Sequence, residues 1–188
     1  MKAPARQRIL ETADRLFSAR GYGNVGINEI IDRSGTAKAS FYAHFPSKLA
    51  LCAAWLEKRH AHSAAEWAGV LGGTGAVPEK VMKLLDGLKA FLEGSEFRGC
   101  PFTNTAGFLG AEAEATRVHA LIARHKEQHR EFFIDLARQM TTPARATRLG
   151  AALFLLYSGA TMESQNARAV WPVDAARAGA KLLFKSLA

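Results

Sequence analysis

Apolar residues recur at every third or fourth position along most of the chain, which is the spacing that places side chains on one face of an α-helix. The first such stretch has charged residues between its apolar positions, which are Ile9, Ala13, Leu16 and Phe17. Gly21 and Gly23 follow, so we expect this helix to end at about Arg20. No segment of the sequence alternates apolar and polar residues in the manner of a β-strand. The pattern therefore predicts an all-α protein.

Two short helices are expected next. The first covers residues 27–33 and is closed by Gly35. The second covers residues 38–45 and ends before Pro46, because proline disfavours the helical conformation of the residue that precedes it. The last two of these three N-terminal helices are joined by a turn that contains glycine. This arrangement is typical of a helix-turn-helix, in which the last helix enters the major groove of DNA.

Longer helices are predicted for the rest of the chain, and segments rich in glycine, proline or threonine separate them. After a long helix that begins near Ser47, the main breaks fall at residues 72–78, 94–101, 141–143 and 171–172. Apolar periodicity returns after each break and predicts helices over residues 81–92, 111–140, 144–169 and 173–187. The sequence contains no internal repeat and no low-complexity run.

Positive charge is concentrated near the N-terminus. The chain of 188 residues has a net charge of +8 and a pI of about 9.8. Residues 1–60 carry ten basic and five acidic side chains, a net charge of +5, and the remaining two thirds carry +3. A basic N-terminal third is the electrostatic signature of a nucleic-acid-binding module. A basic surface that only keeps the protein in solution fits a charge of this size equally well.

Composition excludes several other classes of protein. Two cysteines, Cys52 and Cys100, are too few for a disulfide framework. No apolar run approaches the roughly 18 residues that span a bilayer, and the N-terminus lacks the apolar core of a signal peptide. An apolar content of 48% is far above that of disordered chains. These observations predict a globular cytoplasmic protein.

The second short helix carries groups that suit DNA reading. Lys38 offers a cation, and three side chains offer neutral hydrogen-bonding groups for phosphates or base edges, namely Ser40, Tyr42 and His44. Phe41 and Phe45 are four residues apart and form one apolar face. Any short helix packed on a core has the same two faces, so composition alone leaves both interpretations open.

A longer motif resolves this ambiguity. Gly21-Tyr22, Ile30, Gly35 and the string Lys-Ala-Ser-Phe-Tyr-Ala-His-Phe-Pro-Ser-Lys at residues 38–48 closely resemble the DNA-binding domain of TetR-family transcriptional repressors. The resemblance covers about residues 5–52 without an insertion. It implies that Lys38, Ser40, Tyr42 and His44 touch DNA, and that Tyr42 and Lys48 occupy the usual phosphate-contacting positions.

The sequence also departs from the TetR pattern. Ala39 stands where relatives usually have glycine, and Val25 and Gly26 replace a common Thr or Ser before the second helix. Ala37 replaces a common Ser at the start of the recognition helix, so Thr36 becomes the expected substitute N-cap and a further candidate DNA contact. These departures affect individual contacts and not the class of protein.

The resemblance also implies an organisation for the whole chain. Residues 1–48 would form the helix-turn-helix DNA-binding domain, and residues 49–188 a helical ligand-binding and dimerisation domain. Relatives form homodimers through their last two helices and bind double-stranded, palindromic operator DNA. Small and apolar residues in these helices fit such an interface: Leu149, Ala152, Leu153, Leu156, Gly159, Ala160, Ala176, Leu182, Leu183 and Phe184.

The clearest local signal in the second domain is the Gly-Cys-Pro-x-x-Asn segment at residues 99–104. It resembles a segment of one TetR subgroup, some of whose members sense electrophiles or oxidants through cysteine. An exposed Cys100 thiol could be alkylated or oxidised. A buried Cys100 would only fill space, as we expect for Cys52.

A small-molecule pocket is usually apolar with a few polar groups. The candidate lining residues for such an effector site are Trp55, Trp67, Phe97, Cys100, Phe102, Asn104, Phe108, His119 and Tyr157. Aromatic residues at helical spacing are also typical of an ordinary core. His125 and His129 are four residues apart, but they lack further ligands at suitable spacing and have basic neighbours. We therefore interpret them, like His60 and His62, as surface residues, and we expect no metal or other cofactor.

The sequence thus favours a dimeric, ligand-responsive repressor that a small apolar or electrophilic effector releases from its operator, and we do not expect an enzyme. Two alternatives stay open. One is a thiol-dependent enzyme using Cys100, although no general base and no phosphate-binding loop are evident near it. The other is a DNA-binding architectural protein without an effector.

Overall fold

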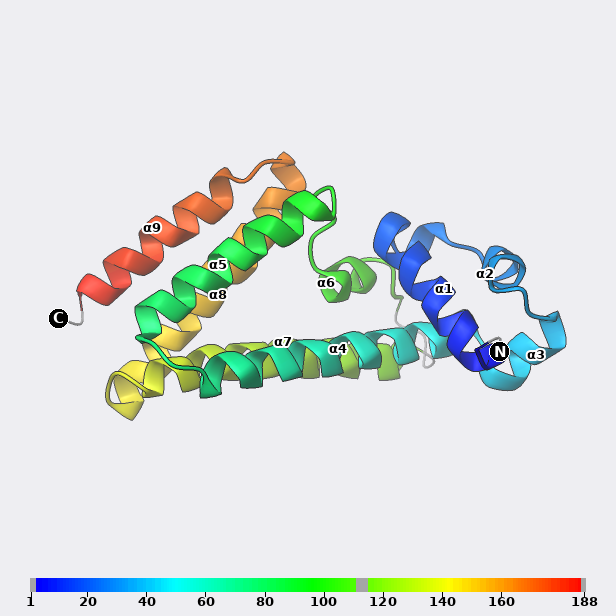
Figure 1. Ribbon diagram of the computed structural model, residues 1–188, viewed down its shortest axis with the longest axis horizontal. Helices are drawn as coiled ribbons and strands as arrows, with labels where there is room; N and C mark the ends of the chain where they lie inside the picture. The colour runs from blue at the N-terminus through cyan, green and yellow to red at the C-terminus, as the bar shows by residue number, and fades with distance from the viewer. Residues whose placement is uncertain (1–2, 111–114, 187–188) are drawn as a thin grey trace. The chain divides into compact units, whose positions relative to one another are not determined.

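The computed structural model describes residues 3–110 and 115–186, and within these ranges it contains helices and turns but no strand (Figure 1). The expected all-α fold is therefore confirmed. The elements in chain order are α1 (Ala5–Arg20), the 3₁₀ turn η1 (Tyr22–Asn24), α2 (Ile27–Ser34), α3 (Lys38–His44), α4 (Lys48–Gly72), α5 (Val77–Gly94), α6 (Pro101–Ala106), α7 (Thr116–Arg138), α8 (Pro143–Ala167) and α9 (Trp171–Lys185). No helix among the described residues is long and apolar enough to cross a membrane.

Most helix ends lie where glycine and proline predict them, but two helices begin earlier than expected. Helix α5 starts at Val77, with Pro78 in its first turn, and the second case is α9. It starts at Trp171, so Pro172 lies in its first turn and not before it. Proline is tolerated in a first turn because the N–H that it lacks would have no intrahelical partner there. The first residues of the helix predicted from residue 111, and Leu187 at the end of the last predicted helix, lie outside the described residues.

The chain divides into two compact units. The first comprises residues 1–62 and 101–125, and the second comprises residues 63–100 and 126–188. One boundary between the units lies inside α4, after residue 62, and another lies inside α7, after residue 125. Each of these two helices therefore contributes to both units. The division at residue 48 that the sequence predicts concerns function and stays a prediction.

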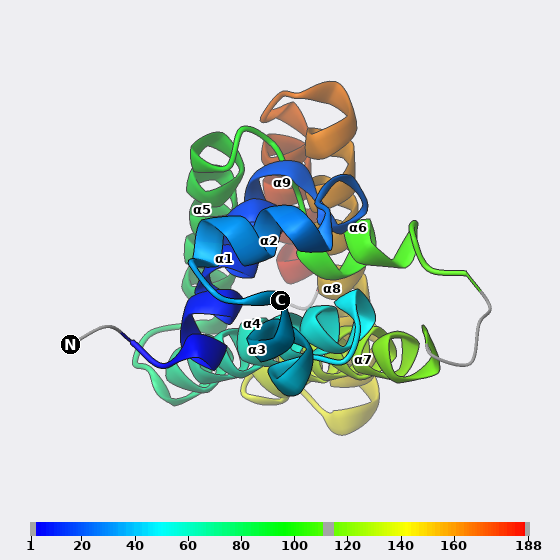
Figure 2. The ribbon, with the colours of Figure 1, turned by 90° about the vertical axis from the view of Figure 1, so that its right-hand side faces the viewer.

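In the first unit, α1 packs against α2 and α3 (Figure 2). Its core contains the apolar positions that the helical spacing identifies, including Ile9, Ala13, Leu16 and Phe17. The indole of Trp55 on α4 lies edge-on against Phe17, with ring centroids 5.1 Å apart. Its Nε1–H donates to Asp14 Oδ1 at 2.7 Å, and Arg59 Nε donates to the same oxygen at 3.0 Å. Apolar packing and a shared carboxylate thus fix α4 to α1.

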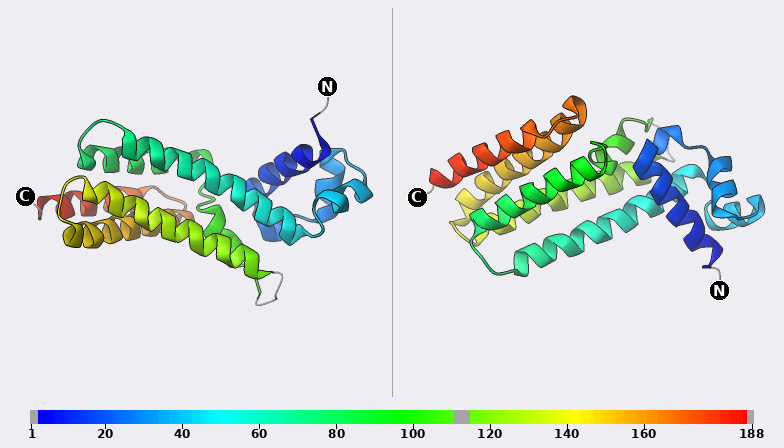
Figure 3. Two further views of the ribbon diagram at one scale, coloured as in Figure 1. Left: turned by 90° about the horizontal axis from the view of Figure 1, so that it is seen from below. Right: turned by 45° about the horizontal axis from the view of Figure 1, so that its top comes forward.

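In the second unit, α5, α8 and α9 lie side by side (Figure 3). Their core is built from leucine, valine, alanine and phenylalanine side chains, among them Leu85, Leu92, Phe133, Leu153 and Val173. Gly150 on α8 faces α7 so closely that an added Cβ would lie 2.4 Å from the Ile134 Cα atom. Only glycine permits this approach of the two helix backbones.

Candidate functional site

The turn between α2 and α3 depends on Gly35. This residue is left-handed, with φ 60° and ψ 42°, and its N–H donates to Asp32 O at 3.1 Å. The N–H of Thr36 donates back to Ile31 O at 3.3 Å. These bonds satisfy carbonyls at the end of α2, because glycine adopts the left-handed conformation without steric cost. The helix-turn-helix geometry that the sequence predicts is present.

Helix α3 has one face in the core and another in solvent. Phe41 and Phe45 are buried, with ring centroids 6.3 Å apart. Lys38, Tyr42 and His44 are exposed, and Ser40 is half-buried. The structure therefore brings the four predicted reading residues together on one short helix whose position is set by two buried phenylalanines.

The predicted role of Thr36 as an N-cap is wrong. The N-cap of α3 is Ala37, and no side chain caps this helix. The Thr36 hydroxyl lies 2.8 Å from the hydroxyl of Ser34, which itself donates to Ile31 O at 3.0 Å. The Thr36 hydroxyl is thus held by a side chain two residues away and does not bond to the N-terminus of α3.

An ion-pair network holds the start of α2. Glu29 in its first turn pairs with Arg20 at the end of α1, and Arg33 Nε lies 2.9 Å from Glu29 Oε1. The hydrogen bond from Arg20 holds the pKa of the Glu29 carboxyl below its usual value, and the charges of both arginines add to this effect. The network links α1 to α2 near the N-terminus of α2, where a carboxylate is favourable.

Lys48, the first residue of α4, lies over an aromatic ring. Its Nζ atom is 4.2 Å from the centroid of Tyr22. Burial lowers the pKa of Lys48, and negative charge at Cys52 opposes this effect. Ser47 Oγ accepts a hydrogen bond from the Ala50 N–H at 3.1 Å and caps the helix. The ring of Tyr22 thus orients the ammonium group at a helix N-terminus, which attracts anions.

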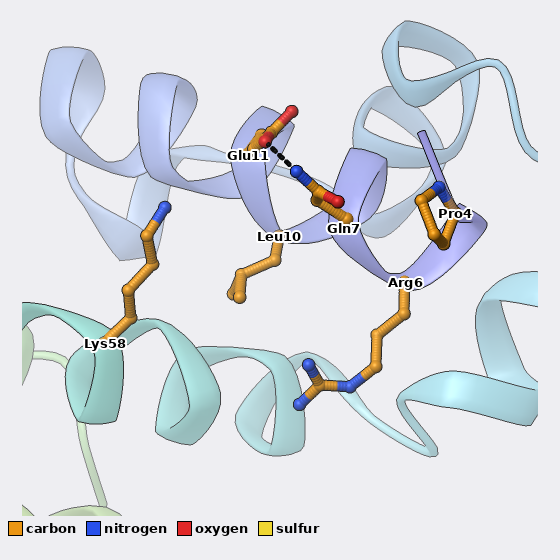
Figure 4. Close-up of a pocket in the computed structure, with 6 residues that line it drawn as sticks. All are labelled: Pro4, Arg6, Gln7, Leu10, Glu11 and Lys58. Atoms are coloured by element: carbon orange, nitrogen blue, oxygen red, sulfur yellow. Dashed lines mark hydrogen bonds between the residues drawn. The ribbon is translucent and has the colours of Figure 1, made fainter. Parts of the chain in front are cut away.

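A surface hollow of about 430 Å³ lies between α1 and α4 (Figure 4). Its lining combines two cations, one carboxylate and uncharged groups: Arg6, Lys58, Glu11, Pro4, Gln7 and Leu10. Gln7 Nε2 donates to Glu11 Oε1 at 2.9 Å across its wall. The guanidinium of Arg6 lies 5.4 Å from the Phe45 ring, next to α3. Sequence reasoning did not identify this hollow, because it depends on how α1 and α4 meet.

Two predicted effector residues, Cys100 and Tyr157, lie near each other in the second unit. Cys100 is half-buried, and Lys126 Nζ lies 3.8 Å from its Sγ atom. Burial raises the pKa of the Tyr157 hydroxyl to about 12, and negative charge at Cys100 and Glu66 adds to this rise. Gly99, with φ 68°, precedes Cys100 and faces the side chain of Gln165. The thiol therefore has a cation on one side and a buried phenol within electrostatic range.

The interpretation of His125 and His129 as surface residues is wrong, because their exposed fractions are 5% and 8%. His129 stacks on Trp67 with ring centroids 4.7 Å apart, and it also lies against the rings of Phe133, Phe154 and Tyr157. Burial lowers the pKa of His129 to about 3, and the positive charge of Lys126 contributes. The prediction was wrong because it relied on the basic residues next to these histidines. The seven-residue spacing of His125 and Phe132 indicates that both lie on the buried face of the helix.

His125 belongs to the first unit, where it contacts a second histidine. Its Nδ1 atom lies 3.1 Å from Nδ1 of His60, which is half-buried, so the surface interpretation fails for His60 as well. The buried ring of Phe102 stacks on His125 with centroids 3.5 Å apart. His62 is exposed, as expected. Among the described residues, no group of three or more His, Cys, Asp or Glu side chains could hold a metal ion.

The structure divides the other candidate effector residues between the units. Trp55 and Phe102 are buried in the first unit, where Asn104 is half-buried and Phe108 and His119 are exposed. Trp67 and Phe97 belong to the second unit with Cys100 and Tyr157. Trp55, with its hydrogen bond to Asp14, is a core residue. The aromatic group around His129 is the part of the candidate set that packs together.

An exposed apolar stripe runs along the last two helices. Leu155 and Met162 on α8 and Trp171 and Leu182 on α9 are exposed, with exposed fractions of 66% for both leucines. Gly159 is exposed between the first two. Several predicted interface residues lie instead in the core of their own unit, namely Leu149, Leu153, Ala160 and Ala176. The sequence identified the two helices correctly as apolar but mixed their inward and outward faces.

The N-terminal segment is similar to known regulatory proteins. Residues 9–55 match the family model described as bacterial regulatory proteins, tetR family. The chain is 50% identical over 42 residues to the HTH-type transcriptional regulator LmrA of Bacillus subtilis, an alignment that spans 22% of each chain. It is 24% identical over 187 residues to the HTH-type transcriptional repressor NemR of Escherichia coli, spanning 94% of this chain and 92% of NemR. The match to LmrA covers only about a fifth of the length of that protein.

Solved structures share the fold of the whole chain. SCO4454, a TetR-family regulator from Streptomyces coelicolor, superposes with a TM-score of 0.82 at 24% identity, covering 97% of this chain and 95% of that protein. The reduced form of E. coli NemR gives a TM-score of 0.77 at 19% identity, with coverage of 94% and 95%. At these identities the likeness establishes the fold and not the ligand.

Proposed function

The chain carries the N-terminal domain of the TetR family of bacterial regulatory proteins, and from this premise we propose that it is a dimeric transcriptional repressor that a small molecule releases from operator DNA. One observation carries the proposal. Inside the matched segment, a left-handed Gly35 turn presents α3 with its two phenylalanines buried and Lys38, Tyr42 and His44 exposed. An exposed polar face on a helix after such a turn is what major-groove reading requires.

In this function the side chains of the helix-turn-helix have distinct roles. Lys38, Ser40 and His44 read base edges or phosphates from α3, while Tyr42 and Lys48 hold phosphates. Thr36 contributes less than the sequence indicates, because its hydroxyl is bonded to Ser34. The positive charge of residues 1–60 supplies attraction that does not depend on sequence.

The experiment that tests the proposal is selection of duplexes with a randomised centre by the full-length protein. We expect enrichment of a palindrome whose half-sites lie about one helical turn apart, since two recognition helices related by a two-fold axis bind such sites. Binding to the selected duplex should weaken steeply with salt. A basic but non-reading protein would bind all duplexes alike, and that result would overturn the proposal.

A second copy of the chain is the proposed partner at the apolar stripe of α8 and α9. Leucine side chains that are two-thirds exposed, such as Leu155 and Leu182, are costly to leave in water when further apolar side chains are exposed on the same two helices. Gly159, exposed between Leu155 and Met162 on α8, allows a partner helix to approach closely. A two-fold pair of α8 and α9 helices would bury the whole stripe, in agreement with dimerisation in the family.

The surroundings of Cys100 support the proposal that one class of effector is an electrophile. Its thiol is half-buried, and the Lys126 Nζ atom lies 3.8 Å from its Sγ atom. With a Michael acceptor such as N-ethylmaleimide, Sγ forms a bond to the alkene carbon, and the thiol proton ends on the neighbouring carbon. Cys52 cannot compete, because burial raises its pKa to about 12. One adduct per chain, at Cys100, is therefore expected from mass spectrometry.

The DNA readout separates sensing from simple reactivity. N-ethylmaleimide should release the selected duplex from the parent protein but not from Cys100→Ser, while Cys52→Ser responds like the parent. Equal release from the parent and Cys100→Ser would remove the cysteine from the mechanism and leave a non-covalent apolar effector. Turnover of the electrophile that Cys100→Ser abolishes would instead support the enzyme hypothesis.

A further inference from the structure

We propose that Arg8 is a positioning residue for the recognition helix, an inference that rests on the proposed DNA-binding function. Its guanidinium donates three hydrogen bonds to backbone carbonyls. Nε donates to Ser34 O at 3.1 Å, Nη2 to Gly35 O at 3.1 Å, and Nη1 to Ala3 O at 2.7 Å. One side chain of α1 thus joins the residues before α1 to the turn between α2 and α3.

The turn needs donors at this place. The last four carbonyls of a helix have no intrahelical partner, and they form the negative end of the helix dipole. Ser34 is the last residue of α2, and Gly35 follows it in the left-handed conformation. A charged donor bonds such carbonyls about twice as strongly as a neutral one. Arg8 therefore closes the C-terminus of α2 from outside.

The same bonds fix where α3 starts. Helix α3 begins at Lys38, only three residues after Gly35. Phe41 in the middle of α3 and Phe45 at its C-terminal end anchor the helix in the core, while Arg8 holds the backbone that leads into it. Two anchors at opposite ends define a helix direction, whereas one anchor leaves the helix free to swing about it.

In this role Arg8 does not touch DNA. Three of its five N–H groups are engaged with carbonyls, and the residue is half-buried. Hydrogen bonds to base edges require donor–acceptor distances near 3 Å, whereas attraction to phosphates acts over the roughly 10 Å of ionic screening. A small displacement of α3 therefore weakens base reading more than it weakens binding to arbitrary DNA.

Only arginine fits this role. The planar guanidinium presents several N–H groups in a rigid fork, so one group reaches carbonyls in different directions. The ammonium of lysine is a single point on a flexible stem and cannot reproduce the pair of bonds to Ser34 and Gly35 together with the bond to Ala3. Arg8→Lys keeps the charge and tests the geometry alone.

The test compares full-length Arg8→Lys and Arg8→Gln with the parent on the duplex obtained by selection and on a scrambled duplex of the same composition. Arg15→Gln is the matched control, because Arg15 also lies on α1. Its Nη2 atom donates to the hydroxyl of Thr12 on the same helix, 3.1 Å away, and not to the turn between α2 and α3. We expect a roughly tenfold loss of affinity for the selected duplex, as for a lost charge-assisted bond, with scrambled-duplex affinity and salt slope nearly unchanged.

Circular dichroism gives the melting temperature of each variant. Binding is then measured well below that temperature, so that a loss of affinity does not reflect unfolding. A salt slope that falls by about one unit would make Arg8 a phosphate contact and overturn the proposal. An unchanged ratio of selected to scrambled affinity, with only a lower melting temperature, would reduce Arg8 to a stabilising residue. If the parent selects no duplex at all, the proposed function fails, and this outcome is distinct from a failure of Arg8.

Discussion

The imidazole of His129 lies in the second unit among the rings of Trp67, Phe133 and Tyr157, and burial lowers its pKa to about 3. An unfolded histidine has a pKa of about 6.5. Below that value the unfolded chain binds a proton that the folded chain does not, so the folded state loses stability. The stabilisation is fully present above about pH 6.5 and is lost as the pH falls toward 3.

This shift predicts an acid dependence that one substitution removes. Between about pH 6 and pH 4, the free energy of unfolding of the parent should fall by up to about 1.4 kcal/mol per pH unit because of His129. His129→Phe should show a smaller fall, since a phenyl ring takes no proton. Urea unfolding at pH 7 and pH 4.5 measures the difference.

His62→Gln is the control, because His62 is exposed on α4. It should keep the acid dependence of the parent. If His129→Phe loses stability with acid as steeply as the parent does, then His129 is not the group that titrates.

Lys48 carries the prediction that tests phosphate contact. Its ammonium lies over Tyr22 at the start of α4. Lys48→Ala should weaken binding to selected and scrambled duplexes alike, and it should lower the magnitude of the salt slope by about one unit. Fluorescence anisotropy over a series of salt concentrations measures this slope. Lys89→Ala on α5 should leave it unchanged, and an unaltered slope for Lys48→Ala would remove Lys48 from the contact set.

Several residue roles could be read from the sequence, and others could not. The buried faces of α1 and α3 follow from spacing alone, as Ile9, Phe41 and Phe45 confirm. The imidazole of His125 was misjudged because its partner His60 is 65 residues away in the sequence, and only folding brings the two rings together. The hydroxyl of Thr36 was misjudged for another reason, because its partner Ser34 lies only two residues away. The spacing of apolar residues predicts which face of a helix is buried, but it does not predict which polar side chains bond to each other.

At the scale of the helix, glycine and proline mark almost every boundary, since each acts on the backbone next to it. The exceptions are α5 and α9, where Pro78 and Pro172 lie inside the first turn. The unit to which each candidate effector residue belongs could not be predicted from local residues in this way. Trp55 and Trp67 lie on the same helix, yet one belongs to the first unit and the other to the second. Nothing in the spacing of aromatic residues reveals where α4 passes from one unit to the other.

The close crossing of α7 and α8 predicts unequal effects for two glycines. Gly150→Ala would place a methyl group 2.4 Å from the Ile134 Cα atom, so the helix backbones must separate. Overpacking of this kind costs about 1–3 kcal/mol of unfolding free energy or more. Gly87 on α5 has open space around it, and Gly87→Ala should stabilise by about 0.5–1 kcal/mol through helix propensity.

Denaturant unfolding of both variants checks this contrast. Because the two substitutions add the same methyl group in a helix, any difference between them reports the space available at each position. A Gly150→Ala variant that is as stable as the parent would show that α7 and α8 can move apart without loss.

At the scale of the whole molecule, the exposed stripe of α8 and α9 predicts an oligomer. Leu155→Glu and Leu182→Glu each place a charge in the row and should shift the protein from dimer to monomer in sedimentation measurements. Phe91→Glu is the matched control, because Phe91 is 44% exposed on α5, outside the row. It should leave the mass in solution unchanged.

Loss of the dimer should also reduce operator binding, because a monomer engages one half-site and forfeits the gain in effective concentration that the linked second half-site provides. Affinity for the full palindrome should therefore fall toward that for a single half-site in Leu155→Glu. A monomeric variant that keeps full affinity would separate dimerisation from DNA binding.

A row of small and apolar residues on α8, all exposed except the half-buried Ala152, also has a definite period. Ala152, Leu155, Gly159 and Met162 follow one another at steps of three, four and three, which is the seven-residue repeat of a coiled-coil seam. An α-helix has 3.6 residues per turn, so a row that repeats every 3.5 drifts slowly around the helix. A partner helix that follows this row must wind around α8 with a left-handed twist, crossing at about 20°. The spacing of four side chains therefore fixes the handedness with which two copies of the protein would meet.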